Sequence, residues 1–182
     1  PSLAVELIPI PMYYSLSKRE IDILITVQEP TQKKIVARKL TRYRLGLFST
    51  RQYLDSREEI TSKKQLREHR FIGYIDDLLF DQDLDLMGEI LPGLSADFRC
   101  STVVAQLRAV ASGAGIGIIP FFMATSEKSL TPLLPELTVE KAYWLQVNPD
   151  SRQLARVRTT IDFIAEQISQ SQDQFLSFSP SC

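Results

Sequence analysis

The sequence is poor in the residues that build many catalytic and metal sites. It has one histidine, two cysteines and one tryptophan among 182 residues. The single histidine, His69, does not support a Ser-His-Asp or Cys-His arrangement. It follows a predicted short helix, and we interpret it as a surface helix terminus where a positive charge complements the helix dipole. Enzymatic activity, a cofactor and a metal centre are therefore not expected.

Cysteine usage and hydrophobic runs narrow the class of protein further. Cys100 lies in a predicted strand, where a buried structural thiol is expected. Cys182 is the last residue, so no disulfide framework is indicated, and a reducing, cytoplasmic location fits best. We find no signal-peptide pattern and no apolar run long enough to span a membrane. A soluble globular protein is indicated.

The charge is nearly balanced, with 21 basic and 22 acidic residues and a net charge of -1. Binding to nucleic acid through this segment alone is therefore not expected, because phosphate binding needs a basic surface. A local basic cluster alternates with apolar residues, which favours the solvated face of a strand. Its members are Lys33, Lys34, Arg38, Lys39, Arg42 and Arg44.

Predicted strands and helices alternate along the chain. Strands are expected at residues 3–8, 21–27, 34–40, 44–49, 70–75, 116–119 and 139–147. Ser62 and Gln65 form a capping-box pattern for a short helix. A second helix begins at Ser101 or Thr102 and ends near Gly113, and a third runs from Leu154 to Ile168 with Asp150 or Ser151 as its cap. This order predicts a mainly parallel or mixed sheet covered on both faces.

Two segments resemble ligand-binding loops, but neither has the neighbouring elements or residues that such a loop requires. The glycines from Gly113 to Gly117 follow a helix and precede a strand, whereas a dinucleotide-binding loop needs the reverse order. They are interpreted as a helix C-cap and a crowded strand entry. The acidic segment 76–94 lacks the glycine and glutamate positions of a calcium loop. The start of the second helix is a better binding candidate, because free backbone N–H groups join the hydroxyls of Ser101 and Thr102 there.

The segment from Cys100 to Pro120 resembles the V-x-x-G-x-G-I-x-x-x-P stretch of the LysR-type transcriptional regulator effector domain. The segment 16–25, Leu-Ser-Lys-Arg-Glu-Ile-Asp-Ile-Leu-Ile, resembles an L-S-R-R-E-A-D-I-A segment of one branch of that family. The likeness covers nearly all of residues 1–170, in order.

The resemblance implies an α/β fold similar to type 2 periplasmic binding proteins, with two lobes joined by two crossover strands and an effector in the cleft. Lobe I would comprise residues 1–44 and 146–175, lobe II residues 45–145, and a flexible tail residues 176–182. The first strand and helix of lobe I, and a DNA-binding helix-turn-helix, would precede Pro1. Lobe I would then be only partly contained in this chain.

The resemblance also implies a set of effector-binding residues. In lobe I these are Pro11, Met12, Thr26 and Val27, and in lobe II they are Ile75, Asp76, Ser101, Thr102 and Phe121. The two acidic residues Asp76 and Asp77 disfavour a purely anionic ligand unless they point outward.

The expected function is sensing of a small metabolite, which modulates how a homodimer or homotetramer binds promoter DNA through its missing N-terminal domain. The alternative is a stand-alone solute-binding protein of the same fold that serves transport.

Overall fold

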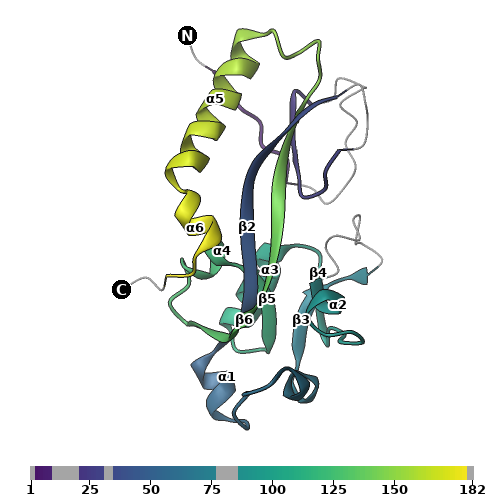
Figure 1. Ribbon diagram of the computed structural model, residues 1–182, viewed down its shortest axis with the longest axis vertical. Coiled ribbons are helices and arrows are strands. Elements are labelled where there is room, and N and C mark those ends of the chain that lie inside the picture. The colour runs from purple at the N-terminus through teal and green to yellow at the C-terminus, as the bar shows by residue number, and fades with distance from the viewer. Residues whose placement is uncertain (1–2, 10–20, 31–34, 77–85, 180–182) are drawn as a thin grey trace. The chain divides into compact units, whose positions relative to one another are not determined.

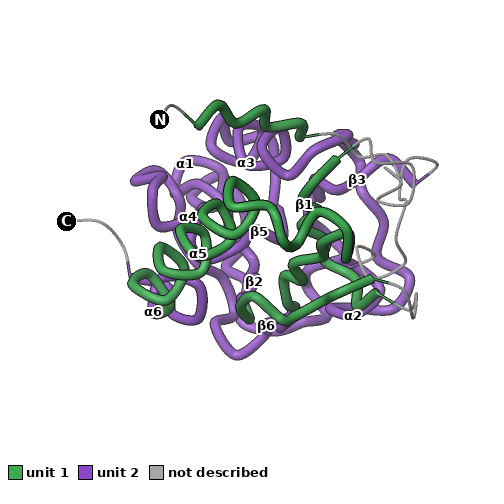
Figure 2. The backbone as a smooth tube through the Cα atoms, turned by 90° about the horizontal axis from the view of Figure 1, so that it is seen from above, with its two compact units in different colours: residues 1–42, 142–172 green, residues 43–141, 173–182 purple. Residues whose placement is uncertain are grey.

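A computed structural model gives the architecture and describes residues 3–9, 21–30, 35–76 and 86–179 (Figure 1). The chain forms two compact units: unit 1 comprises residues 1–42 and 142–172, and unit 2 comprises residues 43–141 and 173–182 (Figure 2). The chain passes between the units within β2 (Val36–Thr50), within β6 (Leu130–Val147) and after residue 172.

Unit 2 is built on three parallel strands. β3 (Phe71–Tyr74) lies between β4 (Phe98–Cys100) and β5 (Ile116–Pro120) and is parallel to both. The second half of β2 pairs antiparallel with β5. The helical segments of this unit are α1 (Arg51–Asp55), the 3-10 helix η2 (Lys63–Glu68), α2 (Leu86–Ile90), α3 (Val103–Ala111) and α4 (Phe121–Ala124). The predicted α/β class is confirmed.

The core of unit 2 lies between α3 and the sheet. Phe48, Val110 and Ile119 are fully buried there. Two glycines allow this packing, as the sequence predicted. Gly113 ends α3 with a φ of 79°, a conformation that glycine adopts readily. A Cβ at Gly117 would lie 2.5 Å from Val110 Cγ2, so only glycine lets α3 approach β5 this closely.

Unit 1 has a smaller core. β1 (Ile23–Thr26) pairs antiparallel with the end of β6, with Ile23 opposite Val147. The long helix α5 (Ala155–Gln170) contributes Val157 to a buried cluster with Leu145 and Val147. Ile23, Leu40 and Ile161 pack against this cluster and are partly buried.

Four of the predicted strands differ from the structure. Residues 3–8 do not form a strand. Within the described residues no strand pairs with them, and their apolar side chains are exposed. The two strands expected at 34–40 and 44–49 are one, β2, because the alternation of buried and exposed residues continues through Thr41 and Tyr43. β6 begins at Leu130 rather than near Val139.

The predicted helix starts are confirmed where a side chain close in sequence caps the helix. Thr102 caps α3 by accepting a hydrogen bond from Ala105 N at 3.2 Å. At η2, Gln65 Oε1 accepts from Ser62 N at 2.9 Å, as a capping box requires. The cap expected at Asp150 or Ser151 is wrong: these residues lie in turns, and α5 begins after Leu154 without a side-chain cap.

The segment after α5 belongs to unit 2 from residue 173 onward. α6 (Gln172–Leu176) follows α5 after one residue. The ring centroid of Phe178 lies 4.9 Å from that of Phe48, and those of Phe175 and Phe122 are also 4.9 Å apart. The flexible tail that the resemblance implied at residues 176–182 begins within this segment. The sequence pattern did not predict the ring contacts, because isolated aromatic residues among polar ones give no helical periodicity.

Candidate functional site

Parallel strand pairing brings the predicted site residues of unit 2 to one edge of the sheet. Tyr74 lies opposite Cys100, and Ile75 N donates to Cys100 O at 3.1 Å. β5 runs parallel to β3 on its other side. The carboxyl ends of all three strands therefore lie at the same edge. The predicted site residues Ile75, Asp76, Ser101, Thr102 and Phe121 come directly after these ends.

The order of the strands makes this edge a favourable place for a ligand. The chain passes from β3 to β4 on one side of β3, and α3 then returns it to β5 on the other side. In open α/β sheets such a reversal leaves a crevice at the carboxyl ends of the strands, and ligands bind there.

The start of α3 presents hydrogen-bond donors at this edge. Thr102 Oγ1 accepts from Ala105 N, so its own hydrogen is left for another acceptor. Ser101 is exposed, and within the described ranges its hydroxyl has no hydrogen-bond partner. Together with the first backbone N–H groups of the helix, these hydroxyls can hold a carbonyl or carboxylate oxygen.

Asp76 is turned toward solvent and is paired. Its side chain is 72% exposed, and its Oδ2 lies 3.5 Å from the Arg99 guanidinium. Such an exposed pair contributes little to stability. It does partly offset the negative charge next to Ile75, so this carboxylate is a weaker obstacle to an anionic ligand than the sequence alone indicated.

Phe121 is the first residue of α4. Its side chain is half-buried and packs against neighbouring residues of unit 2. Its ring makes an edge-to-face contact with Phe48, at a centroid distance of 6.1 Å. A Cβ at Gly46 would lie 2.8 Å from Phe121 Cε1, so the ring lies directly over the backbone of β2. Phe121 thus has a structural role, beside whatever contact it makes with a ligand.

Among the site residues predicted in unit 1, Thr26 has the best-defined surroundings. Its hydroxyl donates to Gln28 O at 2.9 Å and accepts from Gln146 Nε2 at 2.8 Å. With its one hydrogen in use, Thr26 Oγ1 can offer a ligand only an acceptor. Val27, the next predicted residue, is half-buried. Pro11 and Met12 lie outside the described residues.

Gln146 is a residue that the sequence analysis did not single out. It is 6% exposed and lies on β6, opposite Leu24. The sequence does contain a feature that could have identified it, since Gln146 is the one amide in the apolar run Tyr143-Trp144-Leu145-Gln146-Val147. A buried amide needs partners, and here its side chain orients the Thr26 hydroxyl.

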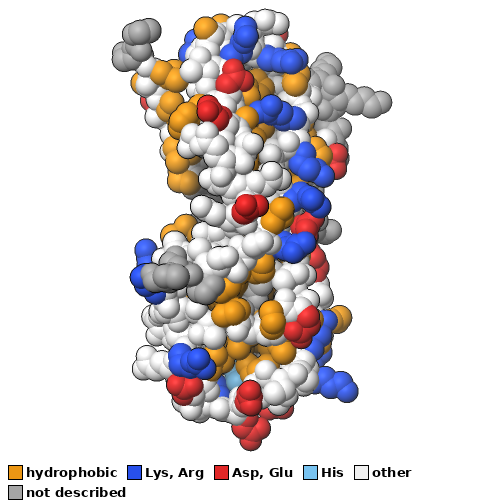
Figure 3. All heavy atoms as spheres, turned by 60° about the vertical axis from the view of Figure 1, so that its left-hand side comes forward, with side chains coloured by type: hydrophobic (Ala, Val, Ile, Leu, Met, Phe, Trp, Pro, Cys, Tyr) orange, Lys and Arg blue, Asp and Glu red, His pale blue; other side chains and the backbone are white. Residues whose placement is uncertain are grey.

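A cavity of about 580 Å³ lies elsewhere in unit 1, between β2, β6 and α5. Its apolar lining consists of Val36, Leu145, Val147 and Ile161. Its polar lining is exposed and consists of Arg38, Arg152, Gln153, Arg158 and Asp162. Lys and Arg side chains are spread beside hydrophobic ones on the surface in Figure 3. None of the predicted site residues lines this cavity, and no buried polar group converges on it, as ligand sites usually require.

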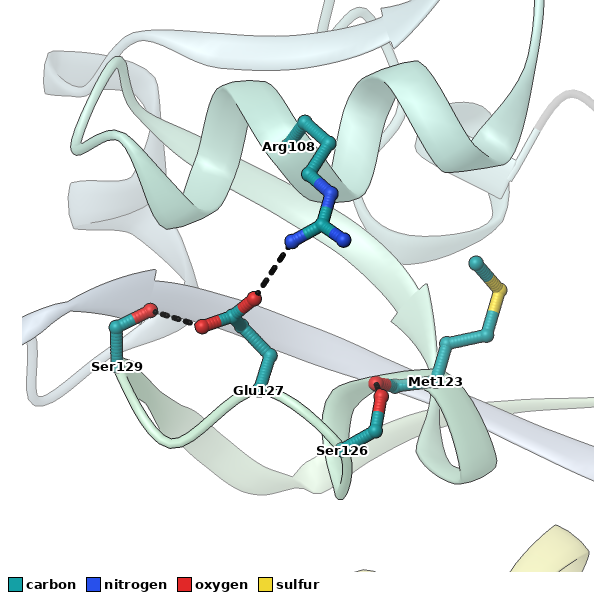
Figure 4. Close-up of polar contacts among 5 residues, drawn as sticks. All are labelled: Arg108, Met123, Ser126, Glu127 and Ser129. Carbon is teal, nitrogen blue, oxygen red and sulfur yellow. Dashed lines mark hydrogen bonds and ion pairs between the residues drawn. The ribbon is translucent and has the colours of Figure 1, made fainter.

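An ion pair fixes α3 to the loop that follows α4 (Figure 4). Arg108 Nη1 lies 3.1 Å from Glu127 Oε2, and Ser129 Oγ donates to Glu127 Oε1 at 3.1 Å. Ser126 Oγ donates to Met123 O at 2.7 Å and closes α4. These contacts position α3, whose first turn carries Ser101 and Thr102.

Cys100 and His69, the two residues considered as candidates for catalysis, both lie in surroundings that suit a structural role. Cys100 is buried, as predicted, and burial raises the pKa of its thiol. His69 is the C-cap residue of η2, the helix terminus that was predicted, but it is half-buried, and burial and the nearby Arg57 lower the pKa of its imidazole, which disfavours the expected positive charge. The His69 ring lies instead against Tyr53, at a centroid distance of 6.0 Å. Within the described ranges no His, Cys, Asp and Glu cluster could hold a metal ion.

Comparison with known proteins identifies the family. A family model, the LysR substrate binding domain, matches residues 1–169. This chain belongs to that family. The match confirms the resemblance seen in the sequence, and the family is defined by binding rather than by catalysis.

Relatives and solved structures agree with this assignment. The chain is 23% identical over 155 residues to the iron-regulated virulence regulatory protein IrgB of Vibrio cholerae, covering 81% of this chain and 52% of IrgB. It thus spans about half the length of that relative. The regulatory domain of CrgA from Neisseria meningitidis, a LysR-type transcriptional regulator, matches with a TM-score of 0.71 and 23% identity over 84% of this chain and 78% of that one.

Full-length AphB, a virulence activator of Vibrio cholerae, matches with a TM-score of 0.62 and 20% identity over 91% of this chain and 56% of AphB. These structural likenesses show the fold, which is the two-lobed, periplasmic-binding-protein-like fold expected from the sequence. None of the helices in the described ranges is long and apolar enough to cross a membrane.

Proposed function

We propose that this LysR-type substrate-binding domain senses a small-molecule effector in the cleft between its two lobes. The observation that carries the proposal is the carboxyl edge of β3, β4 and β5, where parallel pairing gathers the predicted lobe II residues at a reversal of strand order. Lobe I would add Thr26 and Val27, together with Pro11 and Met12.

The polarity of these groups restricts the effector. The start of α3 offers hydrogen-bond donors, which suit a carbonyl or carboxylate oxygen. Thr26 offers an acceptor, because its hydrogen is held by Gln28 O, and so suits a hydroxyl or ammonium donor. We therefore propose a small polar metabolite that carries both kinds of group. Phe121 would supply an apolar contact.

In the whole regulator, effector binding would shift a pre-existing equilibrium between lobe arrangements. The shift would change how a homodimer or homotetramer engages promoter DNA through an N-terminal helix-turn-helix. A solute-binding protein for transport remains the alternative. The coding sequence upstream of Pro1 separates the two: a helix-turn-helix supports the regulator, and a signal peptide supports the transport protein.

A thermal-shift screen of polar metabolites, followed by calorimetric titration, tests sensing directly. Ser101→Ala and Thr26→Val should each weaken binding of a hit by about tenfold, since one hydrogen bond to a ligand contributes roughly 0.5–1.5 kcal/mol and more when charged. Ser126→Ala and Thr160→Val are matched controls, because the Ser126 hydroxyl donates to Met123 O at the end of α4 and the Thr160 hydroxyl donates to Arg156 O within α5. Unchanged affinity in both test variants would refute the proposed site.

A further inference from the structure

The chain crosses between the two units a third time, beyond the two crossover strands of the fold. β2 and β6 account for two crossings. The third occurs after α5, where residue 172 belongs to unit 1 and residue 173 to unit 2. We propose that residues 172–179 form a C-terminal strap that restricts the motion of the units relative to each other. This proposal does not depend on any effector.

Aromatic side chains anchor the strap to unit 2. The ring of Phe178 contacts the fully buried Phe48 and lies 6.1 Å from Phe121, centroid to centroid. Phe175 contacts Phe122, which in turn lies 6.2 Å from Tyr43. Close, tilted or edge-to-face ring pairs of this kind are favourable beyond the apolar area that they bury.

The other end of the strap joins unit 1 without slack. α5 ends at Gln170 and α6 begins at Gln172, so Ser171 alone separates the two helices. The backbone of this joint is itself bonded, since Ser171 N donates to Ile168 O at 3.1 Å. Neither glycine nor proline lies between residue 155 and residue 179. A movement of the units must therefore bend the joint or pull the rings from their contacts.

The strap also connects with the predicted effector site. Phe178 packs on Phe121, the residue that directly follows β5 at the carboxyl edge. Phe48, the main partner of Phe178, belongs to β2, one of the two crossover strands. Release or tightening of the strap would thus act on a crossover strand and on the residues at the edge of the predicted site.

Distance measurements between spin labels test the strap. Exposed Thr159 in unit 1 and Asp55 in unit 2 are replaced by labelled cysteines in a Cys182→Ser background, while buried Cys100 stays unreactive. The decisive variant inserts about six Gly and Ser residues between Ser171 and Gln172, which form a flexible linker and leave the rings free to pack. A second variant combines Phe175→Ala and Phe178→Ala.

We expect both variants to broaden the distance distribution, and the insertion to do so without lowering the melting temperature. Phe163→Ala, on a 60% exposed ring of α5, is the matched control and should leave the distribution unchanged. If the insertion leaves its width unchanged, the strap does not exist. If only the double variant broadens it while also lowering the melting temperature, the rings serve the core of unit 2 alone, and the proposal is likewise overturned.

Discussion

The two units differ in the size and packing of their buried cores. In unit 2, helix and sheet interlock around Phe48, Val110 and Ile119, and glycines allow the closest approaches. In the described part of unit 1, the buried cluster is small and consists of Leu145, Val147 and Val157, and Phe163 of α5 is exposed. The core of unit 2 supports the strand ends there, whereas the Thr26 side chain of unit 1 is held by two hydrogen bonds, one to Gln28 O and one from Gln146.

The largest expected effect compares equivalent truncations in the two cores. Leu47→Ala in unit 2 and Leu145→Ala in unit 1 remove the same atoms from residues that are 1% and 2% exposed. Such changes lower the free energy of unfolding by about 2–5 kcal/mol, and by more where the surroundings cannot relax. We expect Leu47→Ala to lie at the upper end and Leu145→Ala at the lower end, as measured by urea denaturation. Equal losses would contradict the difference between the units.

A smaller effect is expected from overpacking unit 2. Gly117→Ala would place a methyl group against Val110 Cγ2, and such strain typically lowers the free energy of unfolding by about 1–3 kcal/mol. The double variant Gly117→Ala with Val110→Ala provides the control, since it makes room for the new methyl. If the double variant is no less stable than Val110→Ala alone, the clash explains the loss. If Gly117→Ala alone is neutral, the helix and sheet are less closely packed than described.

The smallest effect concerns pH. The pKa of His69 is lowered in the folded protein, by burial first and by Arg57 second. Between that lowered pKa and the unfolded value near 6.5, the unfolded state binds more protons, so stability falls as the pH is lowered through this window. We expect His69→Gln to flatten this slope, measured as the free energy of unfolding between neutral and mildly acidic pH. An unchanged slope would show that His69 is not the group responsible.

The sequence predicted unit 2 better than unit 1, for physical reasons. Thr102 and Gly113 are local signals for the two ends of α3, and the compact run from Ile116 to Pro120 specifies β5. Residues 3–8 carry an equally strong strand pattern but form none, because a strand also requires a neighbour. Propensity cannot supply that neighbour.

The candidate site shows the same limit. Residues at the strand ends of unit 2 could be predicted, since parallel strands bring their carboxyl ends together once the motif is recognised. The bond from Gln146 to Thr26 could not, because it joins residues 120 positions apart. The aromatic anchors of the C-terminal segment were missed for a similar reason: Phe175 and Phe178 find their partners only in the folded chain.

Backbone amide shifts of the isotopically labelled chain, titrated with a metabolite hit, test the central claim most directly. The proposed site predicts the largest shifts at Ile75, at Asp76 and in the first turn of α3 from Ser101 to Ala105, with a further response at Thr26. Shifts confined to the cavity of unit 1, at Arg152, Gln153, Arg158, Ile161 and Asp162, would contradict the account and place the ligand in that cavity.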